Sequence, residues 1–131
     1  MSTISKNRQL NPNIKNWQDI AEYYPEEAKG IMELQCEVAC TIGVNEKIAA
    51  KIIATAKIAK IIEFGYGNML TIKEWENEQL VKYNIENISG TIAYNDVTDN
   101  YSFISFHTDE QRDEFMSYPE NVNLVKQYFM M

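Results

Sequence analysis

The side chains that could do chemistry in this sequence are few, and they do not form a known catalytic set. His107 is the only histidine in the 131 residues, and it lies between a predicted strand and a predicted helix. A hydrolytic triad requires an oriented base beside an activated nucleophile, and nothing near His107 marks either one. His107 is therefore expected to lie at a helix junction, and the chain is predicted not to be an enzyme.

The carboxylates, cysteines and glycines match no metal or phosphate site. Asp96 and Asp99 have the spacing of a partial calcium loop, but the glycine and the closing glutamate of that loop are missing. Cys36 and Cys40 have no second cysteine pair or histidine cluster to complete a zinc site. The segment 65–69 follows a predicted helix, whereas a phosphate-binding loop follows a strand. No metal and no cofactor are expected.

Arginine and aromatic residues are more suggestive of ligand binding. Arg112 is expected in the first turn of a helix, where it could clamp a phosphate or carboxylate with free backbone N–H groups. The alternative is an ion pair with Asp109, three residues earlier on the same helix. Tyrosine and tryptophan are common where one side of a site is apolar and the other is wet. The candidate ligand-binding residues are Arg112, Tyr94, Tyr101, Phe103, His107 and Trp75.

The first half of the chain predicts helices that would position these residues. Residues 1–15 are polar and are expected to form a flexible arm, and 16–131 a single domain. Asn16 is a suitable N-cap for a helix through Tyr23, and Pro25 begins a second helix that is expected to end at about Ile42, before Gly43. A helix over 46–64, capped by Asn45, follows after a short link and is expected to run antiparallel to it.

The helix over 46–64 carries apolar residues on more than one side. Ile58 and Ile61 lie away from its main apolar face, among lysines that include Lys57. A surface that faces solvent does not need two isoleucines, so this helix is either the centre of the core or part of a subunit interface. On the second alternative, Ile58, Ile61 and Lys57 are interface residues and the protein is a homo-oligomer.

After residue 67 the pattern changes to short strands. The segment 69–85 is ambiguous between strand and loop, 88–94 and 101–106 are predicted strands, and 95–100 is a predicted turn. Apolar residues on both faces of 101–106 indicate an interior strand. Thr108 and Gln111 resemble a capping box, and Pro119 begins a last helix. The fold class is therefore α+β, with an N-terminal helical hairpin packed on a small antiparallel sheet and followed by C-terminal helices.

Charge limits the partners. The net charge is −7. From residue 69 onward there are four basic and eleven acidic residues, so this half of the chain carries the whole excess of negative charge. An acidic surface opposes binding to duplex nucleic acid and favours either a basic partner or simple solubility. No apolar stretch is long enough to span a membrane, and the N-terminus lacks the apolar core of a signal peptide.

The layout of residues 45–131 resembles a known group of proteins. It comprises the Ala-Lys-Ile helix over 49–62, the Phe-Gly-Tyr-Gly break at 64–67, the segment around Trp75, paired strands and the run from Ser105 to Phe115. In this layout the chain is similar to small uncharacterised accessory proteins of phages and prophages of Bacteroides-type bacteria. The resemblance implies a phage accessory role in the cytoplasm of an infected host, and it supplies no catalytic residues.

Together these observations predict a non-catalytic binding protein that interferes with a host component as a counter-defence. It would sequester a small nucleotide-type signal or mask a host protein. The alternative is a structural or cargo protein of the virion. An enzyme with a metal or carboxylate site ranks last, because no set of residues supports it.

Overall fold

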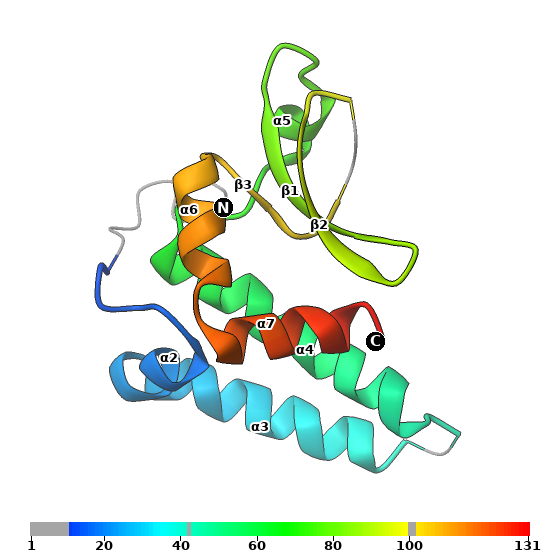
Figure 1. The fold of residues 1–131 in the computed structure, drawn as a ribbon. Helices are drawn as coiled ribbons and strands as arrows, with labels where there is room; N and C mark the ends of the chain where they lie inside the picture. The colour runs from blue at the N-terminus through cyan, green and yellow to red at the C-terminus, as the bar shows by residue number, and fades with distance from the viewer. Residues whose placement is uncertain (1–10, 42, 100–101) are drawn as a thin grey trace.

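The predicted α+β fold is confirmed in the computed structural model, which describes residues 11–41, 43–99 and 102–131 (Figure 1). N-terminal helices precede a three-stranded antiparallel sheet, and C-terminal helices follow it. The elements are α2 (Trp17–Tyr23), α3 (Pro25–Ala39), α4 (Glu46–Gly65), α5 (Ile72–Glu76), β1 (Lys82–Ile88), β2 (Thr91–Val97), β3 (Ser105–Phe106), α6 (Asp109–Met116) and α7 (Pro119–Tyr128).

Local caps explain where the N-terminal helices begin. The Asn16 side chain accepts a hydrogen bond from the Asp19 N–H, and the Asp19 carboxylate bonds back to the Asn16 N–H, which is a capping box. Pro25 is the first residue of α3, and the Asn45 side chain caps α4. These three starts agree with the sequence-based prediction. Helix α3 ends earlier than expected, at Ala39, and Ile42 lies outside the described residues.

Helix α4 is at the centre of the helical layer, as Figure 1 shows, with α3 along one side and α7 crossing it on another. Ile58 and Ile61 are both completely buried within the single chain. The core alternative for this helix is therefore confirmed, and the assignment of Ile58 and Ile61 to a subunit interface is wrong. The sequence did not reveal that α7 would cover the second side of α4.

The sheet has the order β2-β1-β3, with β1 in the middle. Strands β1 and β2 form a hairpin whose turn is Ser89–Gly90, and both turn residues have positive φ angles, 52° and 84°. Positive φ at both central positions is typical of the tight turns that join hairpin strands. The predicted strand over 88–94 is therefore confirmed over 91–94 as part of β2, but it wrongly runs across this turn into β1.

Two more predictions for this region are wrong. The predicted turn over 95–100 overlaps the end of β2, which continues to Val97. The predicted interior strand over 101–106 is reduced to the two residues of β3, at an edge of the sheet. The ambiguous segment 69–85 contains a helix that was not predicted, because Thr71 and Glu74 form a capping box that starts α5, and it ends in strand, because β1 begins at Lys82.

The last part of the predicted N-terminal arm is packed against the domain. The Asn11 N–H donates to the Phe64 carbonyl, and the Ile14 side chain is completely buried. The carbonyl of Lys15 accepts hydrogen bonds from the Tyr66 hydroxyl at 3.0 Å and from the Asn121 amide at 2.7 Å. Residues 11–15 therefore belong to the folded domain, and residues 1–10 lie outside the described part.

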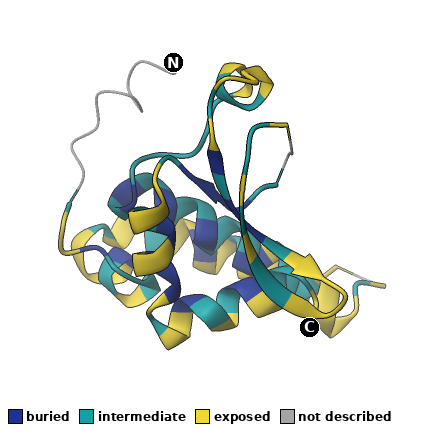
Figure 2. Cartoon of the chain, turned by 45° about the horizontal axis from the view of Figure 1, so that its top comes forward, coloured by how far each residue is buried: buried dark blue, intermediate teal, exposed yellow. Residues whose placement is uncertain are grey.

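One apolar core joins the helices to the sheet. Tyr66, Phe106 and Phe115 meet with ring centroids 5.3–6.2 Å apart, and they come from the end of α4, from β3 and from α6. Figure 2 shows buried residues where these elements meet and exposed residues at the tip of the β1–β2 hairpin. Within the described residues, no helix has the length and apolar character needed to cross a membrane.

Candidate functional site

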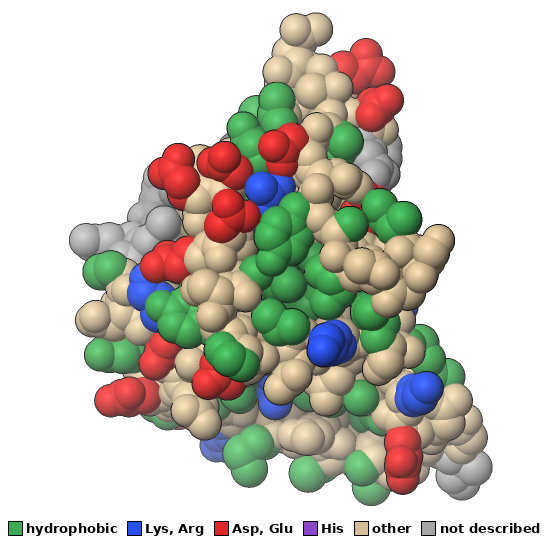
Figure 3. Space-filling model, viewed as in Figure 1, with side chains coloured by type: hydrophobic (Ala, Val, Ile, Leu, Met, Phe, Trp, Pro, Cys, Tyr) green, Lys and Arg blue, Asp and Glu red, His purple; other side chains and the backbone are tan. Residues whose placement is uncertain are grey.

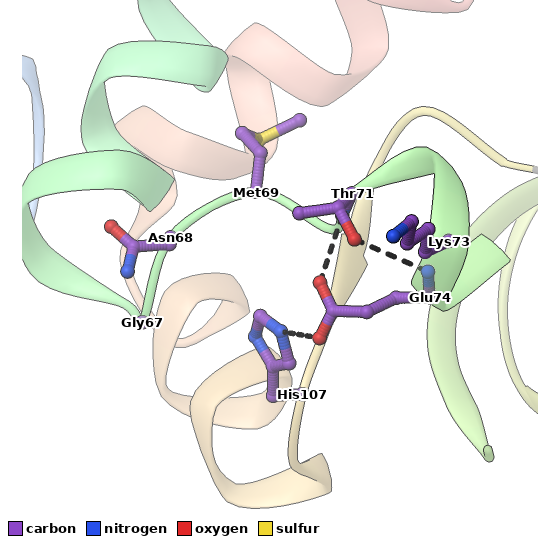
Figure 4. A pocket seen from close by; sticks show the side chains of 7 residues that line it. All are labelled: Gly67, Asn68, Met69, Thr71, Lys73, Glu74 and His107. Atoms are coloured by element: carbon purple, nitrogen blue, oxygen red, sulfur yellow. Dashed lines mark hydrogen bonds and ion pairs between the residues drawn. The ribbon is translucent and has the colours of Figure 1, made fainter. Parts of the chain in front are cut away.

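A pocket of about 440 Å³ lies between the end of α4, helix α5 and the start of α6. It is lined by Gly67, Asn68, Met69, Thr71, Lys73, Glu74 and His107, as Figure 4 shows. The backbone at the end of α4 turns sharply, with φ of 90° at Gly67 and 66° at Asn68. This turn and the capping box of α5 bring Glu74 next to His107, although 33 residues separate them in the sequence.

The His107–Glu74 pair is the most polar contact in this pocket. His107 Nε2 lies 2.8 Å from Glu74 Oε2, and the Thr71 N–H donates to the other carboxylate oxygen at 2.8 Å. Burial acts to raise the pKa of Glu74, but the hydrogen bonds from Thr71 and His107 outweigh it and leave this pKa lowered. Glu74 is therefore held in its ionised form beside His107, and Nδ1 is the ring nitrogen that Glu74 does not contact.

In Figure 4 the imidazole lies between Glu74 and the turn at Gly67 and Asn68. None of the described residues bonds to Nδ1, so this nitrogen is open to a ligand. The residues that line the pocket include no serine or cysteine beside His107 that could act as a nucleophile. Lys73 is the one lysine or arginine among these lining residues. Within the described residues, no group of three or more histidine, cysteine or carboxylate side chains is placed to hold a metal ion.

Arg112 is buried and fully engaged inside the protein. Its guanidinium bonds to Asp96 on β2 at 2.5 Å and to Asp113 at 3.1 Å. It also lies 5.1 Å from the Tyr94 ring centroid and 5.8 Å from that of Tyr83, within cation–π range. Burial acts to lower its pKa, but the two carboxylates outweigh this and raise it. The predicted alternative, an intrahelical pair with Asp109, is wrong in its partner: Arg112 pairs with Asp96 on β2 and with the adjacent Asp113.

This arrangement bears directly on the predicted anion clamp. A phosphate could reach the guanidinium only by displacing two carboxylates that already neutralise it. Arg112 instead fastens α6 to the sheet and holds the Tyr94 ring in place. Tyr94 remains half-exposed on the surface.

A second group of aromatic residues lies at the C-terminal end of α7. The Phe103 and Tyr128 rings stack with centroids 5.3 Å apart, and both line a hollow of about 270 Å³ with Asn87 and Ser102. Asn87 pairs with Ile92 on β2, and Ile92 lies on the same face as Tyr94. We call the surface formed by Ile92, Tyr94, Phe103 and Tyr128 the aromatic surface.

Figure 3 shows apolar side chains gathered at the centre of this face, between the sheet and α7, with acidic side chains grouped to their upper left. Asp96 and Asp113, the two partners of Arg112, keep more than half of their side-chain surface exposed. Lys51 lies over the Tyr128 ring, with its ammonium 5.1 Å from the ring centroid. The aromatic surface therefore has an apolar centre and a charged margin.

The structure separates the predicted ligand-binding residues. Arg112 and Tyr94 lie together, Phe103 lies in the hollow beside Tyr128, and His107 faces Glu74 in the pocket. Trp75 follows Glu74 in α5 but is not among the residues that line this pocket. Tyr101 lies outside the described residues.

Lys57 lies on a different side, in a hollow between α3 and α4, with its ammonium 5.4 Å from the Trp17 ring centroid. Burial lowers the pKa of Lys57. Its assignment to an interface between copies stays a prediction, now without the support of Ile58 and Ile61.

The sequence analysis missed several residues of these sites as binding residues, among them Glu74 in the pocket, Ile92 on the aromatic surface, and Tyr83 and Tyr128. Tyr83 and Tyr128 hold Arg112 and Phe103, respectively. The signal that could have revealed Tyr83 is its position on a strand two residues before Ile85, which places both side chains on one face. Nothing in the sequence around Tyr128 links it to Phe103, because their contact depends on how α7 packs against the sheet.

Comparisons with known proteins give no further guide to these sites. No protein-family model matches the chain, and neither a curated protein nor a solved structure is similar to it.

Proposed function

We propose that this chain is a non-catalytic binding protein that masks a host protein by means of its aromatic surface. The observation that carries this proposal is the exposure of Tyr94, which keeps 48% of its surface in solvent although Arg112 fixes its ring. Aromatic side chains that are held in place and half-exposed are typical anchors of protein interfaces, because little side-chain freedom is lost on binding.

The charges at the margin indicate the kind of partner. Asp96 and Asp113 lie beside Tyr94, and together with Arg112 they leave a local excess of negative charge. Charged margins around an apolar centre direct encounter and select partners with the opposite charge. A basic host protein fits this surface, and the resemblance to phage accessory proteins is consistent with such a role during infection.

A nucleotide-type ligand is less well supported by the same geometry. Arg112, the one arginine among the residues that the structure describes, is occupied by two carboxylates. The pocket beside α5 presents the Glu74 carboxylate, and such a group favours a ligand that donates hydrogen bonds.

The test compares the wild type with two variants, each of which lacks one exposed tyrosine. Tyr94→Ala removes the ring at the aromatic surface, and Tyr23→Ala removes a ring of similar exposure, 45%, on α2. Each form is immobilised and exposed to lysate of a Bacteroides-type host. Captured proteins are identified by mass spectrometry, purified and titrated against each form.

We expect a basic protein that binds the wild type and Tyr23→Ala equally, and that binds Tyr94→Ala at least about tenfold more weakly. Its affinity should fall as salt is raised, because opposite charges meet at the margin. Equal binding to all three forms, or no specific capture by the wild type, contradicts the proposal. A rise in the melting midpoint with one member of a nucleotide panel would favour the nucleotide reading instead.

A further inference from the structure

The outer edge of β2 carries hydrogen-bonding groups that the described chain leaves unused. β2 is an edge strand, and its seven residues pair with β1 without a bulge. In an antiparallel pair, alternate residues direct their N–H and C=O groups toward the partner strand and the others direct them away. The outward residues of β2 are those whose N–H and C=O groups point away from β1.

The hairpin turn determines which residues of β2 point outward. Because Ser89–Gly90 is a two-residue turn, Ile88 and Thr91 form the hydrogen-bonded pair that closes it, and the outward residues of β2 are Ile92, Tyr94 and Asp96. A second observation agrees with this assignment: Ile85, which pairs with Tyr94, donates its N–H to the Ile104 carbonyl on the opposite side of β1.

Three N–H groups and three C=O groups are thus directed away from the sheet. No backbone partner for them is found among the described residues. Edge strands are usually protected from further pairing by proline, lysine or a bulge. β2, with the sequence Thr-Ile-Ala-Tyr-Asn-Asp-Val, has none of these.

The side chains beside this edge identify the kind of strand that fits it. Ile92 and Tyr94 belong to the aromatic surface, so a strand added at this edge would lie along that surface. Asp96 and Asp113 expose 54% and 58% of their side chains there. A second copy of this chain would bring the same carboxylates to the edge, whereas a basic segment would neutralise them.

We propose that the partner docks as an extended basic segment that adds a strand to the outer edge of β2. This inference rests on the proposed function and specifies how the partner is held. Backbone hydrogen bonds to Ile92, Tyr94 and Asp96 give affinity. Lysine or arginine at alternate positions gives specificity, because one of them can lie over the Tyr94 ring while another faces Asp96.

Amide hydrogen exchange, followed residue by residue by NMR, tests the edge directly. In the free protein the outward amides of Ile92, Tyr94 and Asp96 should exchange faster than the inward amides of Ala93 and Asn95. The probe is a capped seven-residue peptide of alternating lysine and valine, and a peptide of alternating glutamate and valine is its control.

At millimolar lysine–valine peptide, exchange at the three outward amides should slow at least about tenfold, since these amides become hydrogen-bonded. The glutamate–valine peptide should leave them unchanged. The inference is overturned if the outward amides do not respond to the lysine peptide, or if they become protected without peptide as the protein concentration rises. The latter result would assign the edge to a second copy of the chain.

Two substitutions at one position separate the backbone from the side chain. Ile92→Pro removes an outward N–H, which costs no hydrogen bond to β1, and Ile92→Ala removes a comparable amount of side chain but keeps that N–H. Ile92→Ala should bind the lysine peptide, and Ile92→Pro should bind it at least about tenfold more weakly. If Ile92→Pro does not fold, the exchange pattern of the wild type still decides the question.

The same variants distinguish this inference from the proposed function. A host protein that is lost by Tyr94→Ala but retained by Ile92→Pro would confirm the aromatic surface and overturn strand addition. A host protein retained by both variants would overturn both proposals.

Discussion

Two glycine-to-alanine substitutions in helices should change stability in opposite directions. Gly30 lies in α3, and a Cβ atom added there meets nothing within 4 Å. Gly30→Ala should therefore stabilise the protein by about 1 kcal/mol, which is the usual difference between the two residues in a helix. Gly65 is the last residue of α4, and its added Cβ would lie 2.5 Å from the Ile14 carbonyl oxygen.

The Gly65 contact is with backbone, so it cannot be relieved by turning a side chain. The segment around Ile14 would have to move away, and Ile14 is completely buried. Burying an isoleucine contributes about 1.5–3 kcal/mol, so losing most of this burial outweighs a helix-propensity gain of at most about 1 kcal/mol. Gly65→Ala should destabilise the protein by about 1 kcal/mol.

Chemical denaturation of the wild type and both variants, followed by circular dichroism, measures these changes. Tryptophan fluorescence provides a second probe, because Trp17 lies only three residues after Ile14. If Gly65→Ala is as stable as Gly30→Ala, then residues 11–15 do not pack against the end of α4. The predicted flexible arm would then be correct for residues 11–15.

Three further predictions concern polar contacts. Arg112→Met should destabilise the protein by about 1–2 kcal/mol. The loss of stability should be smaller in a protein that already carries Asp96→Asn, because the ion pair is then already broken. Additive effects of the two substitutions in a double-mutant cycle would refute the ion pair between Arg112 and Asp96. Because its pKa is lowered in the folded protein, Glu74 stabilises the fold at pH values above the ordinary pKa of glutamate. The stability gap between wild type and Glu74→Gln should therefore narrow as pH falls below about 4.3, and a gap independent of pH would contradict the contact with Thr71 and His107. Tyr66→Phe should cost about 1 kcal/mol through the lost bond to the Lys15 carbonyl, and an unchanged denaturation midpoint would exclude that bond.

The helices of the first half could be predicted because their signals are local. Asn16, Pro25 and Asn45 mark helix starts through contacts within three or four residues, and the structure places them as expected. Thr71 carries the same signal but was missed, because the helix that it starts is only five residues long. A capping box indicates a helix start even where no long apolar pattern follows.

The strands were harder to place for a different reason. Ser89–Gly90 was included in a predicted strand because residues with β-propensity lie on both sides of it. A strand pattern in sequence does not specify where the chain reverses unless the turn residues are recognised. β3 was expected in the interior because both of its faces are apolar, yet it lies at an edge whose residues are buried against the helices.

The candidate binding residues show the same division. Tyrosine and arginine content indicated a binding surface, but not which aromatic residues share it. Phe103 and Tyr128 are 25 residues apart in the sequence and stack only because α7 lies beside the sheet. Arg112 was a candidate anion clamp with an ion pair to Asp109 as the alternative, and the approach of β2 supplies Asp96 as its partner.

By itself, the sequence determined the fold class, the helix starts and the acidic character of the second half, since these depend on residue type and on neighbours within a few positions. The tertiary structure decided what covers Ile58 and Ile61, which carboxylates hold Arg112, and which edge of the sheet is left open. These outcomes depend on contacts between residues far apart in the chain. Such contacts follow from how whole elements pack, which the local pattern of any one segment does not specify.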